Sequence, residues 1–235
     1  TRMISTGSDA AGVLSEYAVL PEAAVLPIPD YLSYQEAATL PCAAVTAWTC
    51  IEAANIQAGD NVLLLGTGGV SIFGLQIAKA LGANVIITSS SDDKLARAAD
   101  LGADATINYK DNLDWGKQAF EVAGSGVNLV IEIGGGGTFN QSMEALTIGG
   151  HISIIGALSG VSTELNLLSM VFKNVHTHGI TVGTREDHEA MNQFFSEHQI
   201  HPIIDKEVSF EEGAEAIIGI ASGNHFGKIV VNINN

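Results

Sequence analysis

The sequence predicts an α/β fold with a doubly wound, six-stranded parallel sheet, and three observations support this prediction. Short apolar runs alternate with amphipathic helical patterns between residues 61 and 183. The connections between them are short, and a glycine-rich turn joins the first apolar run to the first helical pattern. Strands and helices that alternate in this way form parallel sheets with right-handed crossovers.

The first strand and helix are expected within residues 61–81. Residues 62–65 form an uninterrupted apolar run, which is typical of a central parallel strand covered on both faces. A turn follows at residues 66–69, and one helical stripe then contains Val70, Phe73, Gly74, Ile77, Ala78 and Leu81. The helix therefore begins at the carboxyl end of the strand, where its free amides and dipole favour an anion.

The other elements are expected in alternation along the chain. Further strands are predicted at residues 84–89, 104–108, 127–133, 150–156 and 176–183. Helices are predicted between them at residues 92–103, 112–123, 138–146 and 165–173, and before the sheet at residues 33–40 and 43–54. Six strands match the two halves of a dinucleotide-binding sheet.

The glycine turn is the candidate phosphate site. Gly66 and Gly68 fit the first two positions of the dinucleotide pattern GxGxxG, whereas Ser71 replaces the third glycine. The third glycine normally lets the helix pack closely on the strand, so Ser71 weakens the match, and Gly74 is placed to relieve the same crowding. Because turn glycines occur in many α/β proteins, a purely structural role for this turn stays open.

The end of the second strand predicts which nucleotide binds. An acidic residue about 20 residues after the glycines binds the ribose 2′-hydroxyl of NAD. Ser89 occupies this position here. Ser89 and Ser90 offer hydroxyl groups to a 2′-phosphate, and Lys94 follows one helical turn later. We therefore predict NADP rather than NAD.

The distribution of charge bears on the same choice. The net charge is −16, with 26 acidic residues against 10 Lys and Arg, which argues against a nucleic acid or an anionic membrane as partner. Three of these basic residues, Lys94, Arg97 and Lys110, are expected near the end of the second strand or its neighbour. Alternatively, Lys94 and Arg97 only lie on the solvent-exposed face of a helix. Asp92 and Asp93 also argue against NADP, because they would repel a 2′-phosphate if they pointed inward.

Composition indicates a soluble globular protein. Hydrophobic residues make up 46% of the chain, and no apolar run approaches the roughly 20 residues that cross a bilayer. Cys42 and Cys50 are the only cysteines and show no metal-binding spacing, so a reducing cytoplasm is expected. The first residues contain no signal peptide and no initial methionine, which predicts an incomplete or processed chain.

Five segments carry a resemblance to a known family, and they are residues 16–22, 36–48, 58–71, 102–109 and 225–231. In this order they resemble the medium-chain dehydrogenase/reductase superfamily, which includes zinc-type alcohol dehydrogenases and quinone oxidoreductases. The resemblance implies a Rossmann domain at residues 46–200. It also implies remnants of a GroES-like β domain at residues 1–45, with a linker helix, and at residues 201–235. Most of the GroES-like domain would be absent.

The resemblance also implies individual cofactor contacts. Around the nicotinamide it places Thr46, Gly134, Gly156 and Val182. Along the phosphates and adenosine it places Gly66, Thr67, Gly68, Gly69, Val70, Ser89, Ser90, Lys94, Tyr109 and Lys228. Outside the glycine turn, each of these residues is equally compatible with packing or turn chemistry.

Zinc is not expected. Cys42 aligns with the third ligand of the catalytic zinc in alcohol dehydrogenases, but zinc catalysis needs two further protein ligands. The resemblance implies that these come from the absent segment. His176 and His178 share one face of a strand, and nothing near them in the sequence completes a site. We therefore interpret Cys42 as a small buried thiol.

The predicted function is NADP-dependent hydride transfer between the nicotinamide and a carbonyl, alcohol, enone or quinone. No catalytic acid is assigned: Glu132 is a candidate by position, and Tyr17 and Tyr109 by residue type only. The alternatives are a catalytically incomplete NADP-binding fragment or sensor and, less well supported, a methyltransferase, whose ribose site also needs an acid at residue 89. By resemblance, pairing of the sixth strand across a homodimer is expected.

Overall fold

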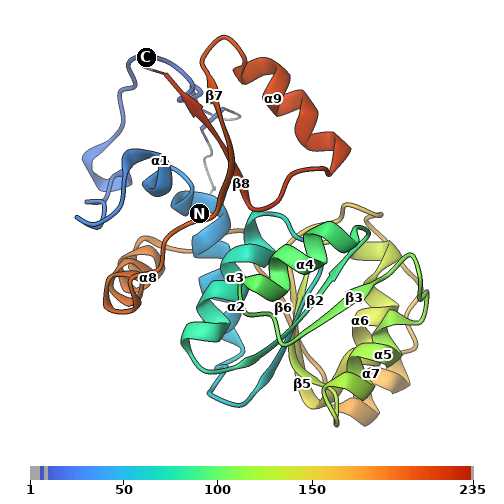
Figure 1. Cartoon of the computed structure of the whole chain (residues 1–235). Helices are drawn as coiled ribbons and strands as arrows, with labels where there is room; N and C mark the ends of the chain where they lie inside the picture. Colours follow the sequence, from blue (N-terminus) through green and yellow to red (C-terminus); the bar gives the residue numbers. More distant parts are fainter. Residues whose placement is uncertain (1–5, 8–9, 234–235) are drawn as a thin grey trace.

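The computed structural model describes residues 6–7 and 10–233. A six-stranded parallel sheet with helices on both faces forms its larger part (Figure 1). The strand order is β3-β2-β1-β4-β5-β6, and every neighbouring pair is parallel. This is the order of a doubly wound dinucleotide-binding sheet, so the predicted fold class is confirmed.

The elements of the sheet domain lie close to their predicted positions. The strands are β1 (Asn61–Leu64), β2 (Asn84–Ser89), β3 (Ala105–Asn108), β4 (Val127–Glu132), β5 (Leu146–Ile154) and β6 (His176–Gly179). The helices between them are α3 (Gly69–Ala80), α4 (Asp92–Asp100), α5 (Trp115–Val122), α6 (Phe139–Ala145) and α7 (Leu167–Lys173). The largest differences from the predicted bounds are in the last two strands. Strand β5 begins at Leu146 instead of residue 150, and β6 ends at Gly179 instead of residue 183.

Strand β1 shows why its sequence has no polar alternation. Val62 and Leu64 point into the core that also contains residues of α3 and α4. Leu63 and Leu65 point into a second core, against α5 and α6. Both faces of the strand are therefore buried, as in other parallel sheets, and apolar residues are needed at consecutive positions.

Helix α8 (Arg185–His198) is absent from the sequence prediction. It begins with a capping box in which Thr184 accepts from the Asp187 amide and Asp187 accepts from the Thr184 amide. Only Met191 and Phe195 are buried along it. Most of its other residues are polar and exposed, and the spacing of Thr184 and Asp187 is the sequence signal that marks its beginning.

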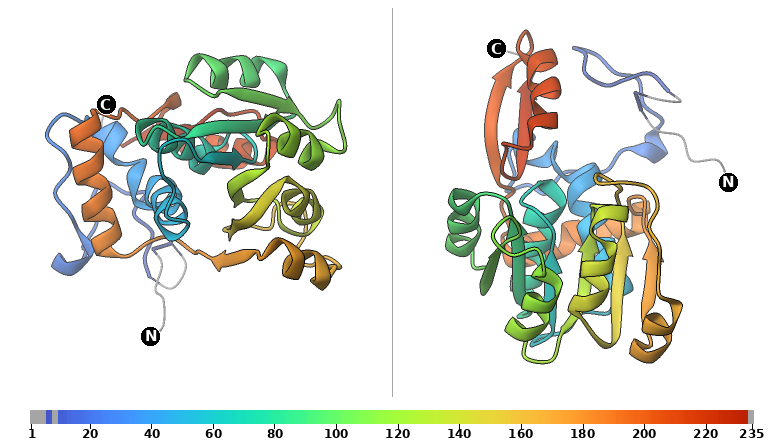
Figure 2. Two further views of the ribbon diagram at one scale, coloured as in Figure 1. Left: turned by 90° about the horizontal axis from the view of Figure 1, so that it is seen from below. Right: turned by 90° about the vertical axis from the view of Figure 1, so that its right-hand side faces the viewer.

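The chain ends form a smaller part on one side of the sheet domain (Figure 2). Strands β7 (Ile204–Ser209) and β8 (Lys228–Asn232) form a parallel pair, connected by α9 (Gly213–Gly219) and the short helix η4 (Ile220–Ser222). The N-terminal part contains η1 (Glu22–Ala24), α1 (Tyr34–Ala37), a π-helical turn η2 (Leu40–Ala44) and α2 (Val45–Ala53). No helix among the described residues is long and apolar enough to cross a membrane.

Candidate cofactor site

The glycine turn connects β1 to α3, whose N-terminus has no side-chain cap. Gly66 has a φ of +70°, which glycine adopts readily, and its amide donates to Thr88 Oγ1 at 3.2 Å. Gly68 is the N-cap of α3, and among the described residues no side chain caps this helix. The amides of the first turn therefore remain available to an anionic ligand.

Ser71 and Gly74 account for the missing third glycine. The Ser71 hydroxyl is buried and donates to the Leu65 carbonyl at 2.7 Å. A Cβ on Gly74 would lie 3.0 Å from Leu64 Cδ2 and 3.3 Å from Ile131 Cδ1. Gly74 therefore lets α3 approach the sheet closely, as predicted, and Ser71 is accommodated through its hydrogen bond.

The C-terminal segment lies directly on the glycine turn. The Gly227 amide donates to the Thr67 carbonyl at 2.9 Å, and Gly68 and Gly227 form an isolated parallel bridge. A Cβ on Gly69 would lie only 2.7 Å from Lys228 Cδ. This packing brings Lys228, which is distant in sequence, to the N-terminus of α3.

The serine cluster lies at the carboxyl end of β2, as predicted. Ser89 is buried and its hydroxyl accepts from the Ser91 amide at 3.3 Å, whereas Ser90 is half-buried. The Lys94 ammonium group donates to the Gly223 carbonyl. Burial holds the pKa of Lys94 below its usual range. Lys94 is thus near the strand end, but its ammonium group contacts the C-terminal segment.

Two charged neighbours of the serine cluster make contacts within the protein. Asp92 accepts from Asn108 Nδ2 at 2.8 Å, so this carboxylate is directed toward β3. Arg97 forms an ion pair with Asp205 at 2.9 Å, and its guanidinium lies 4.1 Å from the Phe226 ring centroid. Arg97 follows β2 on α4, as expected, but its guanidinium contacts the C-terminal segment.

A cavity of about 580 Å³ opens beside the glycine turn. It lies at the carboxyl ends of the central strands and brings together Gly66, Tyr109 and Gly134. The sequence analysis missed its other lining residues, which are Leu65, Thr88, Leu113, Trp115, Ile133, Gly137, Thr138, Gln141, Leu158 and Ser159. They come from strand ends, loops and the first turns of α5 and α6, which are far apart in sequence. No single sequence signal marks them as a set.

Glu132 organises one wall of this cavity. Its carboxylate is fully buried and accepts from the amides of Gly134 and Gly135, at 2.7 and 2.9 Å. It also accepts from Thr138 Oγ1 at 2.6 Å and from the Ser142 hydroxyl. All these donors belong to the protein, so Glu132 holds the glycine loop in place and is not a candidate catalytic acid.

Three predicted nicotinamide contacts lie outside this cavity. The Thr46 hydroxyl is buried and donates to the Cys42 carbonyl at 2.6 Å. Gly156 lines a separate cavity of about 340 Å³, and a Cβ there would lie 2.6 Å from the Ile133 carbonyl oxygen. Val182 is partly buried and packs against the core that contains α2 and α3.

The zinc site implied by family resemblance does not fit the residues present. Cys42 is exposed, so its interpretation as a buried thiol is wrong; it lies in the π-helical turn η2, which buries its neighbours Leu40 and Ala43 instead. Among the described residues, no group of three or more His, Cys, Asp or Glu side chains could hold a metal ion. We therefore derive no chemical step that involves zinc.

The histidines of β6 contact a third histidine. His151 Nδ1 lies 2.9 Å from His178 Nε2, and the rings of His151 and His176 stack with centroids 4.7 Å apart. Burial, together with the two neighbouring imidazoles, holds the pKa of His151 below its usual range. These rings therefore interact with one another at the edge of the sheet.

The sequence of the chain is similar to those of known dehydrogenases. A family model described as zinc-binding dehydrogenase matches residues 69–197. The chain is 43% identical over 97% of its length to a zinc-type alcohol dehydrogenase-like protein from Schizosaccharomyces pombe, and it covers 68% of that protein. It is 34% identical over 94% of its length to the zinc-type alcohol dehydrogenase-like protein YogA of Leptosphaeria maculans, and it covers 65% of that protein.

Solved structures are similar over almost the whole chain. A Sinorhizobium meliloti protein assigned as an alcohol dehydrogenase has a TM-score of 0.94 and 41% identity, with 99% of this chain and 68% of that chain covered. An NAD-dependent alcohol dehydrogenase has a TM-score of 0.90 and 34% identity, with 97% and 67% covered. The 2-octenoyl-CoA carboxylase reductase CinF, in complex with NADP, has a TM-score of 0.82 and 27% identity, with 88% and 51% covered.

Proposed function

Because the chain belongs to the zinc-binding dehydrogenase family of oxidoreductase enzymes, we propose that it binds NADP across the glycine turn and the 580 Å³ cavity. The uncapped N-terminus of α3 is the observation that carries this proposal. We place the NADP-binding domain at residues 46–200, with residues 1–45 and 201–235 as parts of a catalytic domain. The chain spans about two thirds of the length of the relatives above, 68% and 65%.

The residues of the site suit the parts of the nucleotide. The diphosphate faces the amides of residues 68–70 and the Lys228 side chain. The adenine faces the apolar and aromatic end of the cavity, where Tyr109 and Trp115 lie. The 2′-phosphate faces Ser90 and the end of β2, and Lys94 reaches it when its ammonium group leaves the Gly223 carbonyl.

The chemistry that follows is hydride transfer. When bound, the nicotinamide supplies or accepts the hydride, and the substrate is a small carbonyl compound, alcohol, enone or quinone. The contribution of this chain is to bind and orient the cofactor. The loop held by Glu132 shapes the cavity wall, and the amides of α3 fix the diphosphate.

Replacing Ser89 with Asp tests the choice between the two nucleotides. We expect NADP affinity to fall by about tenfold or more, because a carboxylate at the end of β2 repels the 2′-phosphate, and NAD affinity to rise. Isothermal titration calorimetry with both nucleotides measures this exchange. Ser196→Asp on α8 adds the same charge away from the site and is the control. Unchanged NADP affinity in Ser89→Asp contradicts the assignment.

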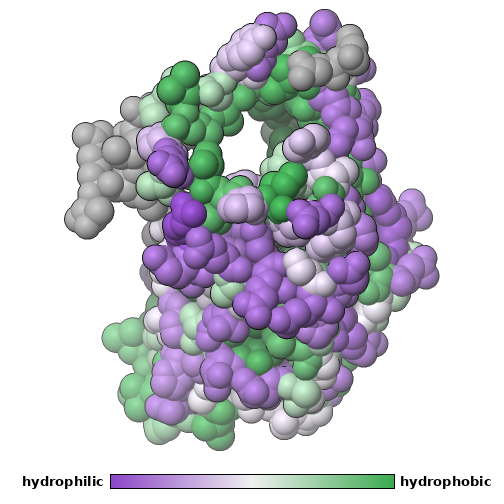
Figure 3. Space-filling view, turned by 90° about the vertical axis from the view of Figure 1, so that its left-hand side faces the viewer, coloured by the Kyte–Doolittle hydropathy of each residue, from purple (hydrophilic) through white to green (hydrophobic). Residues whose placement is uncertain are grey.

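A second candidate function is an NADP-binding protein without catalytic activity, such as a sensor. Two apolar residues of the N-terminal segment, Tyr17 and Val19, favour it because they are 90% and 99% exposed and do not line a substrate pocket among the described residues. Figure 3 shows apolar residues around an opening in the upper part of that view. Steady-state NADPH oxidation with quinones, enones and aldehydes separates the candidates, since binding without turnover supports the second.

We also propose that the chain forms a homodimer through α7 and the outer edge of β6. Strand β6 is at the edge of the sheet. Helix α7 exposes four apolar side chains, which are Leu167, Leu168, Val171 and Phe172. Figure 3 shows apolar residues gathered at the lower left edge of the molecule as well. An exposed cluster of this kind is typical of an interface.

Replacing Phe172 with Lys is expected to weaken this dimer. Phe172 is 77% exposed in the single chain, so a lysine there is compatible with the fold but places a charge in the proposed interface. Sedimentation velocity over a concentration series should show a dimer that shifts to monomer in the variant. Val122→Lys on α5, where the valine is 50% exposed, is the matched control. A wild-type monomer at all concentrations rules the dimer out.

A further inference from the structure

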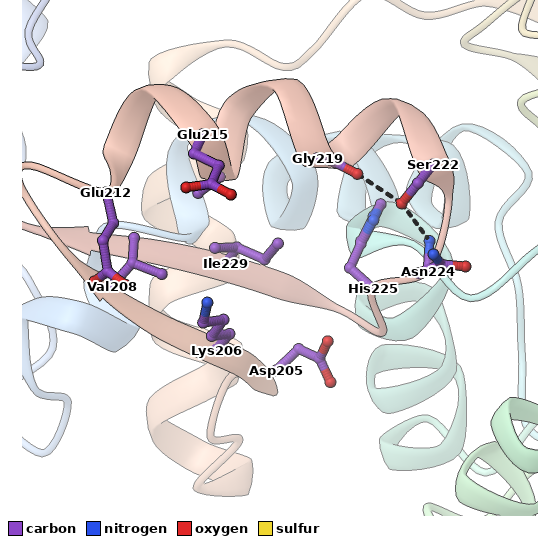
Figure 4. Close-up of a pocket in the computed structure, with 11 residues that line it drawn as sticks. Asp205, Lys206, Val208, Glu212, Glu215, Gly219, Ser222, Asn224, His225 and Ile229 are labelled. Carbon is purple, nitrogen blue, oxygen red and sulfur yellow. Dashed lines mark hydrogen bonds between the residues drawn. The ribbon is translucent and has the colours of Figure 1, made fainter.

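His225 lies on the glycine turn although it is far from it in sequence. It belongs to the connection between η4 and β8, and Figure 4 shows it between Ser222 and the strands, at one end of a cavity of about 410 Å³. Its Nε2 atom lies 3.9 Å from the position that a Cβ on Gly68 would occupy. The imidazole therefore borders the second glycine of the turn, where the proposed diphosphate comes closest to the backbone.

The two ring nitrogens of His225 differ in their surroundings. Nδ1 is buried and has no hydrogen-bond partner among the described residues. A buried acceptor without a partner occurs more often in proteins than a buried N–H without one, because the latter loses its only hydrogen bond. The proton of the neutral ring therefore belongs on Nε2, the nitrogen that faces Gly68.

Burial and neighbouring cations favour the neutral form of the His225 ring. Burial is the main cause that holds the pKa of His225 below its usual range, and Lys94 and Lys228 act in the same direction. Asp205 opposes them, but its carboxylate is paired with Arg97 at 2.9 Å. The remaining charged residues of the cavity are Lys206, Glu212 and Glu215. At neutral pH, His225 is thus an uncharged donor with Lys94 and Lys228 beside it.

We propose that His225 is a further cofactor-binding residue, whose Nε2–H donates a hydrogen bond to the diphosphate of the nucleotide. Lys228, three residues later, lies against Gly69 at the same helix N-terminus, so the C-terminal segment adds two donors to the amides of α3. This inference rests on the proposed NADP binding. Since NAD and NADP share the diphosphate, His225 contributes equally to both, in contrast to Ser89 and Ser90.

Three substitutions of His225 test the position of the donor. A glutamine amide reaches the position of Nε2, whereas an asparagine amide reaches only that of Nδ1, and leucine removes both donors. We expect His225→Leu and His225→Asn to weaken NAD and NADP alike by about tenfold, the usual effect of losing a hydrogen bond to a charged group. His225→Gln should remain within about threefold of the wild-type chain. Isothermal titration calorimetry measures all three.

The controls separate this inference from the proposed function. His198→Leu, on the exposed C-terminal end of α8, removes an imidazole away from the site and should bind both nucleotides like the wild type. If the wild-type chain binds neither nucleotide, the proposed function fails. If it binds them and His225→Leu binds equally well, or if the Gln and Asn variants bind alike, only the role of His225 is overturned. If the leucine variant does not fold, the difference in nucleotide affinity between the Gln and Asn variants still shows whether Nε2 is the donor.

Discussion

Replacing Gly68 with Asp is expected to weaken NADP binding by more than about a hundredfold without loss of stability. Gly68 has an extended backbone, with φ −79° and ψ −178°, and a Cβ there meets no atom closer than 3.9 Å. Aspartate is also one of the preferred N-cap residues. Its carboxylate would accept hydrogen bonds from the free amides of α3 and take the place of the diphosphate. NADP affinity therefore falls, while the free energy of unfolding rises by a few tenths of a kcal/mol.

The opposite directions of these two effects make the test specific. Calorimetric titration gives the loss of affinity, and urea denaturation gives the change in the free energy of unfolding. Gly68→Ala adds the Cβ without the charge and should lose about tenfold in affinity, since only close approach of the diphosphate is hindered. A Gly68→Asp variant that binds NADP as tightly as the Gly68→Ala control would show that the anion binds elsewhere.

Replacing Glu132 with Ala is expected to lower the free energy of unfolding by about 4 kcal/mol. The carboxylate is fully buried and accepts from four donors, and the substitution removes the acceptor that all four share. Affinity for NADP should also fall, because Gly134 and Thr138 line the cavity. Urea denaturation followed by circular dichroism measures the loss of stability.

Glu132→Gln is the matched control for this buried group. Glutamine keeps the size of the side chain and one acceptor oxygen, but its NH₂ group faces donors, so an intermediate loss of about 2 kcal/mol is expected. If Glu132→Ala lost less than about 1 kcal/mol, the carboxylate would not be what holds the loop. The residue would then be open again to a role in binding or catalysis.

The sheet domain could be predicted from the sequence because its signals are local. Residues 62–65 are apolar at consecutive positions since both faces of β1 are buried, and the glycine turn follows directly. Ser91 caps α4 and accepts from the Lys94 amide, so residue type alone marks the beginning of that helix. Each of these patterns reflects the environment of a single element.

The rest of the site depends on contacts between distant segments. The family resemblance implies a cofactor contact for Lys228, but nothing near residue 225 in the sequence indicates that His225 lies on the glycine turn. The hydrogen bond from the Gly227 amide to the Thr67 carbonyl places both residues there. Arg97 has the pattern of a phosphate-binding residue but pairs with Asp205. Cys42 was expected to be buried because small thiols usually are, whereas the π-helical turn leaves it exposed.

A crystal structure of the chain with bound NADP shows directly whether the nucleotide lies across the glycine turn. The diphosphate oxygens should lie within about 3.2 Å of the amides at the start of α3, with the 2′-phosphate beside Ser90 at the end of β2. The adenine should occupy the cavity next to Tyr109 and Trp115. A nucleotide bound in the 410 Å³ cavity beside α9, or with its diphosphate away from residues 68–70, would show that the N-terminus of α3 is not the phosphate site.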